Sequence, residues 1–292
     1  MKPAPFKYIA ATSLEHALSL KAEYGDDARF LAGGQSLIPT MNFRLAQPAI
    51  LIDINRIEDL GAIRPRDGGG ARVGALARYR TLERDTGFAV MFPLIAEALP
   101  HIAHLQIRNR GTIGGNLSHA DPASELPAIA VALGASFRIQ AAKRERWLDA
   151  SDFFVGGLTT DLQPDEMLVE IELPSPKSRT GSCFMEVARR RGDFAIVGIA
   201  AMMTLDQRDE CANVRLAFCG VGETPVDASS AADVLVGRAV TEDAVRDVAA
   251  SVQTMIDPSG SVHATADYQR HIAGVLTERA LQTAYQRARH GS

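Results

Sequence analysis

Two glycine-rich segments carry the residue types best suited to binding chemistry in this chain. Each places paired glycines beside a small hydroxyl residue. Because glycine has no Cβ, its backbone N–H can approach a ligand closely and adopt positive φ, and such turns can surround phosphate oxygens. One double glycine is more often a plain tight turn, but two in compatible contexts predict a dinucleotide held from two sides. The first segment is Ala32, Gly33, Gly34, Gln35, Ser36 and Leu37, and the second is Gly111, Thr112, Ile113, Gly114, Gly115 and Asn116.

Other common signatures of catalysis and binding are missing from the sequence. It has no GxGxxG fingerprint for nicotinamide dinucleotides and no GxxxxGK[ST] loop for nucleoside triphosphates. Ser118, His119 and Asp121 are close in sequence, and neighbours in sequence rarely build a catalytic triad. His101 and His104 have no further ligand at helical spacing, so we interpret them as surface or capping residues. The chain is therefore predicted to hold a ligand rather than to perform acid–base catalysis.

Composition and charge are those of an ordinary soluble globular protein. The chain has 292 residues, of which 46% are hydrophobic and 23% charged, and this length allows two or three domains. A net charge of −4 and a pI near 6.0 argue against nucleic-acid or acidic-membrane binding. We see neither an apolar stretch long enough for a membrane span nor a secretory signal, so we expect a cytoplasmic protein.

The cysteines restrict the metal chemistry of this chain. Cys183, Cys211 and Cys219 are scattered, which fits thiols in a reducing cytoplasm. Three thiols cannot supply the four ligands of a [2Fe–2S] cluster, and they lack the CxxC spacing of a zinc site. Any metal chemistry is therefore expected on another chain.

The first glycine segment is expected within a small βαβ unit. Thr12 to Glu15 has the pattern of a capping box and opens a helix that ends at Gly25. Residues 29–32 then form a short strand that runs into the glycine turn. A helix is expected from Ser36, followed by a buried strand at 49–54.

The second glycine segment is expected within a longer mixed region. Residues 167–173 alternate apolar and acidic side chains, which predicts a half-buried strand. Strands alternate with glycine-rich turns over 57–75. Helical patterns cover 88–104 and 124–133, and strands are expected at 137–139 and 146–148.

Residues 174–178 are the best linker candidate, because the periodicity changes after them. Beyond the linker, several strands are followed by several helices, and this order predicts an antiparallel sheet with helices packed on one face. We expect a first domain at 1–176, with lobes at about 1–56 and 57–176, and a second at 177–292. The strands of the second domain are expected at about 182–189, 195–205 and 213–221, and its helices at 229–236, 242–256 and 268–289.

Four segments together resemble one known family. They read AGGQSLIP at 32–39, QIRNRGTIGGNL at 106–117, ADPASELPA at 120–128 and RRRGDFA at 189–195. The sequence is similar to the FAD-binding subunit of molybdenum hydroxylases, a family that includes carbon monoxide dehydrogenase and xanthine dehydrogenase. The resemblance implies an α+β fold. A two-lobed FAD-binding domain of the vanillyl-alcohol-oxidase (PCMH) type would precede a C-terminal domain with a three-stranded antiparallel sheet and a helical bundle.

The resemblance also implies roles for individual residues. Amides of residues 32–36 and 112–116 would bind the pyrophosphate of FAD between the lobes. The side chains of Ser36, Thr112 and Asn116 would add hydrogen bonds, which are stronger when the acceptor is charged. A β-branched residue at Gly33 or Gly114 would then remove FAD and leave the fold largely intact.

Four further positions are candidates for contacts with FAD. Glu125 stands where the family usually has an Asp that contacts sugar or ribityl hydroxyls, and it is one methylene longer. Asp121 is a second candidate, or else the first residue of an Asp-Pro turn. Leu168 either lines the isoalloxazine or adenine pocket or belongs to the core. Phe194 occupies a place where the family often has an aromatic residue near the flavin ring.

The function implied by the resemblance is electron transfer. A large subunit would hold a molybdenum cofactor, and a small subunit two [2Fe–2S] clusters that pass electrons to FAD on this chain. Flavin suits this relay because it accepts one or two electrons, and a dimer of heterotrimers is implied. One alternative is a self-sufficient FAD-dependent oxidase or dehydrogenase acting on a small molecule. Another is a structural subunit without cofactor, which the intact glycine pairs disfavour.

Overall fold

The first sheet is built from the N-terminal part of the chain. In the computed structural model, which describes residues 2–290, three strands form a parallel sheet in the order β1-β3-β2. This confirms the predicted βαβ unit and adds β1, which the sequence pattern did not reveal. The strands are β1 (Lys7–Ala10), β2 (Ala28–Leu31) and β3 (Ile50–Asp53), and the helices are α1 (Leu14–Tyr24), η1 (Gly25–Asp27), α2 (Leu37–Asn42) and η2 (Glu58–Gly61).

Both ends of α1 are held by side chains. Ser13, not Thr12, caps the helix, because its Oγ accepts a hydrogen bond from the amide of His16 at 3.1 Å. The predicted capping box was therefore one residue early. At the other end the buried Lys21 Nζ donates to the carbonyls of Gly25 and Ala28 at 2.7 and 2.8 Å. This lysine fixes the start of β2, the strand that leads to the first glycine segment.

The second sheet is antiparallel, with the order β4-β5-β10-β6-β7. Its central strand is β10, and the prediction that this strand is half-buried was wrong. Ile171 packs into the main core, and Arg72 and Arg138 of the neighbouring strands pair with the acidic side chains of β10. The strands are β4 (Ile63–Pro65), β5 (Gly70–Gly74), β6 (Ser136–Ala141), β7 (Arg144–Asp149) and β10 (Met167–Pro174).

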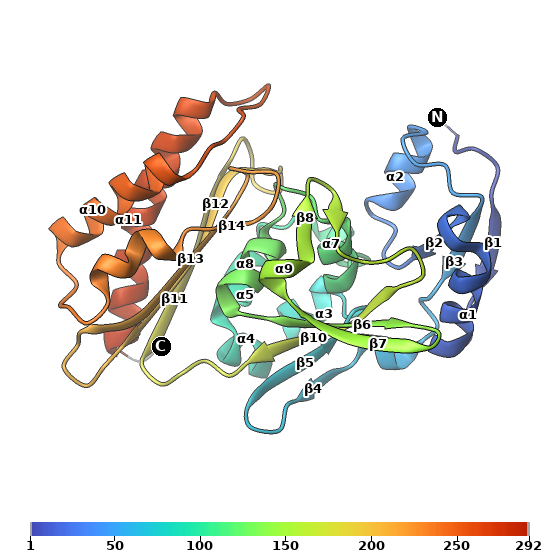
Figure 1. The fold of residues 1–292 in the computed structure, drawn as a ribbon, viewed down its shortest axis with the longest axis horizontal. Coiled ribbons are helices and arrows are strands. Elements are labelled where there is room, and N and C mark those ends of the chain that lie inside the picture. Colours follow the sequence, from blue (N-terminus) through green and yellow to red (C-terminus); the bar gives the residue numbers. More distant parts are fainter. Residues whose placement is uncertain (1, 291–292) are drawn as a thin grey trace.

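Short helices cover this second sheet. The helical pattern predicted over 88–104 is divided at Phe92, because Pro93 starts a new helix there. Every residue of α8 is buried, since it lies between the second sheet and the C-terminal sheet (Figure 1). The elements are α3 (Tyr79–Arg84), α4 (Thr86–Met91), α5 (Pro93–Ala98), α6 (Leu105–Arg108), α7 (Ile113–His119), α8 (Glu125–Leu133), α9 (Ala150–Phe153), β8 (Phe154–Gly156) and β9 (Thr159–Thr160).

The C-terminal part contains the predicted antiparallel sheet, extended by one two-residue strand. Helices α10 and α11 pack on its outer side, and α5 and α8 meet its other side (Figure 1). The segment at 229–236 is a 3-10 helix rather than an α-helix. The elements are β11 (Thr180–Ala188), β12 (Ala195–Leu205), β13 (Cys211–Cys219), β14 (Val226–Asp227), η3 (Ser229–Leu235), α10 (Glu242–Met255) and α11 (Ala266–His290).

One ion pair joins α5 to the C-terminal part. The Glu97 carboxylate accepts from both Nη groups of Arg287 at 2.9 and 3.0 Å, and from the amide of Phe184 at 2.9 Å. A bidentate pair of this kind fixes orientation as well as distance. Within residues 2–290, no helix is both long and apolar enough to cross a lipid bilayer.

Candidate cofactor site

The two glycine segments lie against each other. A Cβ on Gly33 would overlap the carbonyl oxygen of Arg110 and stand 2.9 Å from the Cα of Gly111. A Cβ on Gly115 would lie 3.9 Å from the Cβ of Ala32. Such close approach of two backbones is available only to glycine. A segment that follows β2 and a segment that lies between α6 and α7 thus meet at one place.

The first segment offers free backbone donors. Gly34 has φ +73°, and Gln35 folds back so that its Nε2 donates to the carbonyl of Gly33 at 3.0 Å. Within residues 2–290, no acceptor is found for the amides of Gly33, Gly34, Gln35 or Ser36. Consecutive free N–H groups beside a positive φ form a concave donor surface for an anion. The first segment therefore has the free donors that a phosphate group would need.

The second segment uses its amides internally. The amide of Gly114 donates to Ala75 at 2.9 Å, that of Gly115 to Thr112 Oγ1 at 3.1 Å, and that of Asn116 to the carbonyl of Thr112 at 3.1 Å. Thr112 is buried and caps α7. These contacts do not support the expected role of the Gly114 to Asn116 amides as pyrophosphate donors. The Thr112 amide has no acceptor among residues 2–290, and the first segment lies against the backbone of the second.

Two of its glycines are needed for packing. A Cβ on Gly114 would overlap the backbone and side chain of Ala75, and one on Gly111 would reach 2.5 Å from Cε2 of Tyr79. Backbone atoms cannot move away as a flexible side chain can. A Cβ would overlap backbone atoms at Gly33 as well as at Gly114, so these contacts argue against the expectation that a β-branched residue at either glycine leaves the fold largely intact.

Two polar residues that sequence reasoning missed connect the segments. Asn55, just after β3, donates through Nδ2 to the carbonyls of Leu31 and Ala32 at 3.2 and 2.9 Å. Arg78 donates to the Oδ1 of Asn55 and to the carbonyl of Arg110. The available signal was the position of Asn55, because polar residues that follow the carboxyl end of a parallel strand often face a ligand.

Glu125 lies in a buried acidic environment. It opens α8 with 5% of its surface exposed, and burial, reinforced by the charges of Glu186 and Asp121, raises its pKa to about 8. Glu186 is itself buried and lies 3.1 Å from Nδ1 of His101. Burial, with a contribution from Glu125, also raises the pKa of Tyr79. A Glu125 carboxyl that is neutral below pH 8 can donate a hydrogen bond as well as accept one.

The other predicted residues fall in different environments. Asp121 Oδ1 accepts from the amide of Ala123 at 2.9 Å, which supports its reading as a turn residue. Leu168 is buried in the main core. Phe194 is 70% exposed on the β11–β12 turn, where Gly192 packs against His104 shortly before the second glycine segment. Asn116 donates through Nδ2 to Ser124 Oγ at 3.1 Å, which ties α7 to the start of α8.

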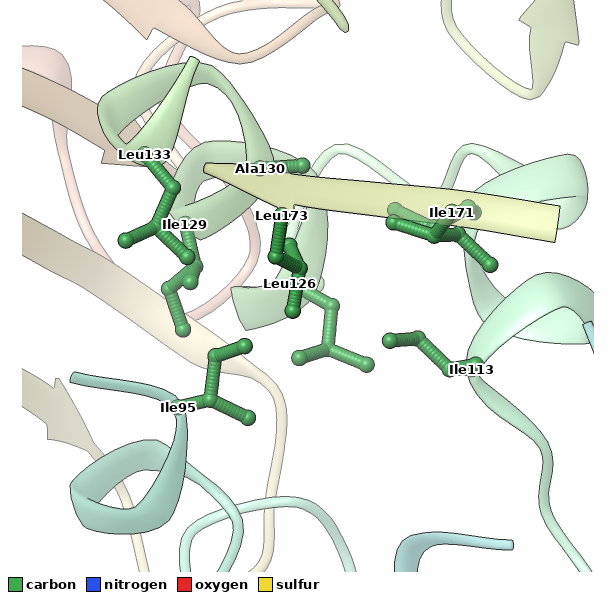
Figure 2. A pocket seen from close by; sticks show the side chains of 9 residues that line it. Ile95, Ile113, Leu126, Ile129, Ala130, Leu133, Ile171 and Leu173 are labelled. Atoms are coloured by element: carbon green, nitrogen blue, oxygen red, sulfur yellow. The ribbon is translucent and has the colours of Figure 1, made fainter. Parts of the chain in front are cut away.

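The core beside the second segment is apolar. Figure 2 shows a cavity next to β10 whose labelled side chains, among them Ile113, Leu126 and Ile171, are all apolar. Its volume is about 10 Å³, far below the space that a nucleotide needs. Because the side chains that line it are apolar, this cavity is part of the packing between α7, α8 and β10 and is not the ligand site.

Metal-binding chemistry finds no support in the part of the chain that the structure describes. Within residues 2–290, no three His, Cys, Asp or Glu side chains come together as a metal site. The thiols of Cys183, Cys211 and Cys219 are buried and unpaired with one another.

The paired glycine segments and the layered α+β fold define a nucleotide-cofactor-binding class of protein. A family model described as the FAD binding domain in molybdopterin dehydrogenase matches residues 4–176, and one for the CO dehydrogenase flavoprotein C-terminal domain matches residues 182–284. The chain belongs to the family of FAD-binding medium subunits of carbon monoxide and xanthine dehydrogenases. FAD is therefore its cofactor, and the chain is an oxidoreductase subunit.

Relatives match over nearly the whole chain. Caffeine dehydrogenase subunit beta of Pseudomonas sp. (strain CBB1) is 42% identical and covers 99% of this chain and 98% of its own. The 6-hydroxypseudooxynicotine dehydrogenase complex subunit alpha of Paenarthrobacter nicotinovorans is 39% identical, and the match covers 99% of this chain and 97% of the relative. A solved structure of carbon monoxide dehydrogenase from Hydrogenophaga pseudoflava superposes with a TM-score of 0.95 at 37% identity, covering 98% of this chain and 99% of that one.

Proposed function

We propose that this chain is the electron-transfer subunit of a molybdenum hydroxylase complex. Its FAD accepts electrons from [2Fe–2S] clusters of a small partner subunit and passes them to an external acceptor. A large partner subunit holds the molybdenum cofactor and acts on the substrate. The observation that carries the proposal is the contact between Gly33 and Gly111, which places a row of free amides where two segments meet. Bound FAD supplies chemistry in both one-electron and two-electron steps.

The residues present suit a diphosphate. The amides from Gly33 to Ser36 provide donors, and Arg78, which donates to the backbone carbonyl of Arg110, provides positive charge where the two segments meet. Anion recognition by backbone amides together with guanidinium groups is strong, because both act on charged acceptors. We place the diphosphate of FAD on this segment and assign the Gly111 to Asn116 segment a supporting role. Asn116 and Glu125 remain proposed contacts to the cofactor.

The proposed partners are supported by the names of relatives. Similar chains are called medium chain or complex subunit, in proteins named after carbon monoxide, caffeine and 6-hydroxypseudooxynicotine dehydrogenases. We propose a dimer of heterotrimers in the cytoplasm, with a domain boundary at residues 176 and 177. The free, buried thiols are consistent with a reducing compartment.

Two measurements on the full chain test the function. After reconstitution with FAD, the purified chain should show flavin absorbance and should be inert toward small-molecule substrates by itself. A tagged chain isolated from its own cells should bring with it one chain that carries molybdenum and one that carries iron and sulfide. Substrate turnover by the isolated flavoprotein would favour the self-sufficient oxidase, and a chain that binds no FAD would remove both functions.

A further inference from the structure

A continuous chain of hydrogen bonds crosses the contact between the two glycine segments. Tyr8 donates its hydroxyl to Asp53, and Asp53 Oδ1 accepts from the Asn55 side chain at 2.6 Å. Asn55 then holds the first segment through the carbonyl of Ala32 and accepts from Arg78. The guanidinium of Arg78 completes the chain at Arg110, at the start of the second segment. The Arg78 side chain thus contacts Asn55, which holds the first segment, and the backbone of Arg110, which precedes the second segment.

The backbone also holds Arg78 in place. Its neighbours run beside the second segment, with the amide of Tyr79 donating to Gly111 at 3.2 Å and the amide of Ile113 donating to Ala77 at 3.0 Å. The backbone of residues 77–79 is thus bonded to the second segment, and the Arg78 side chain extends from it to Asn55 beside the first segment. A change in the Arg78 side chain can alter the spacing of the segments without touching either glycine pair.

The positive charge of Arg78 has no directly bonded carboxylate in the described part of the chain. In residues 2–290 no Asp or Glu lies within ion-pair distance of Arg78 or Arg110. By contrast, Arg146 pairs with Asp161 and Glu166 at 2.6 and 2.8 Å. Burial and the positive charge of Arg110 lower the pKa of Arg78, and the Asp53 carboxylate opposes this shift from beyond ion-pair distance. Half-buried charges in proteins are usually paired.

We propose that Arg78 is a positioning residue for the cofactor's diphosphate. Its two Nη groups set the spacing of the glycine segments through Asn55 and Arg110, and its charge is neutralised by the diphosphate when the cofactor binds. This inference depends on the proposed function, because it assumes that the anion at the first segment is a flavin nucleotide. Arginine suits this task better than lysine, since its planar fork can bond in several directions at once.

The test compares three ligands on the full chain. FAD and ADP carry a diphosphate, whereas riboflavin carries none. Comparing their dissociation constants therefore separates an effect of Arg78 on the diphosphate from an effect on the rest of the binding site. For Arg78→Gln we expect the affinity for FAD and for ADP to fall about tenfold to hundredfold, a weaker salt dependence of binding, and unchanged riboflavin binding. Arg78→Lys keeps the charge and loses the fork, so it should recover part of the ADP affinity.

The matched control is Arg64→Gln, because Arg64 is an exposed arginine on β4 that is paired with Asp59. It should bind all three ligands like the wild type. The inference is overturned if Arg78→Gln binds FAD and ADP normally. It is equally overturned if all three affinities fall together with the melting temperature of the apoprotein, which would indicate a structural role alone. If the wild type and Arg64→Gln both fail to bind FAD, the proposed function fails and the inference fails with it.

Discussion

The carbonyl oxygen of Arg110 occupies the space that a Cβ on Gly33 would fill. Backbone groups from the parallel N-terminal sheet and from the loop after α6 therefore meet without a side chain between them. Each segment limits the position of the other, so the free amides of the first segment are held in place before a ligand arrives. Preorganised donors of this kind bind an anion at a lower entropic cost.

A methyl group at Gly33 should separate the two segments. We expect Gly33→Ala to lower FAD affinity at least about tenfold and to destabilise the chain by roughly 1–3 kcal/mol, as overpacking does. Fluorescence titration with FAD and urea unfolding measure the two effects. Gly61→Ala is the control, because a Cβ there meets nothing within 4 Å. Wild-type affinity in Gly33→Ala would show that the contact is not needed for binding.

Glu125 should make the stability of the apoprotein fall as pH rises. Its folded pKa of about 8 lies above the ordinary glutamate value of 4.5, so the folded state binds the proton more tightly than the unfolded chain. The stabilisation is complete below about pH 4.5 and is lost as pH approaches 8, by up to about 1.4 kcal/mol per pH unit. Asp121, Glu186, Tyr79 and Cys219 surround the group.

Glu125→Gln provides the comparison, since a neutral amide of similar size does not titrate. The difference in unfolding free energy between the wild type and this variant should move in favour of the variant between pH 5 and pH 8. Urea unfolding at four pH values measures it. A difference that does not change with pH would mean that this carboxyl ionises normally in the folded protein.

The Glu97 and Arg287 pair should contribute to the attachment of the C-terminal part. We expect Glu97→Gln to destabilise the chain by about 1–3 kcal/mol, because it weakens the bonds to Arg287 and to the Phe184 amide. A double-mutant cycle with Arg287→Gln should show coupling of at least about 0.5 kcal/mol. The exposed Asp243 and Arg246 pair on α10 is the control, with an effect below about 0.5 kcal/mol.

The three thiols should be inert in the folded protein. Burial raises the pKa of Cys183 and of Cys211 to about 11 and that of Cys219 further above its usual value, so little thiolate forms near neutral pH. A disulfide reagent at pH 8 should label no cysteine in the native chain and all three in denaturant. Rapid labelling of any one cysteine without denaturant would contradict the burial of the thiols.

Sequence periodicity predicted most elements that position the site. Residues 195–205 and the βαβ unit were assigned correctly because β-branched and apolar residues there are bounded by clear turns. The burial of β10 could not be seen, because the arginines that cover Glu170 and Glu172 come from other strands. Pro93 was expected to limit the helical pattern over 88–104, and the structure divides the pattern there.

The glycine pairs were found from sequence, but their different roles were not. A Gly-Gly dipeptide looks the same whether its amides are free, as at Gly33, or bonded to Ala75, as at Gly114. Asn55 and Arg78 were missed because their importance comes from contacts between segments that are distant in the chain. Several of their partners are backbone carbonyls, which leave no residue-type signal.

Hydrogen–deuterium exchange with and without FAD shows whether the first glycine segment holds the cofactor. We expect strong protection of the amides from Gly33 to Ser36 on FAD binding, because these have no acceptor among residues 2–290. The amides of Gly114, Gly115 and Asn116 already have acceptors, so their exchange should change little. Bound FAD that leaves the exchange of the first segment unaltered would contradict the account.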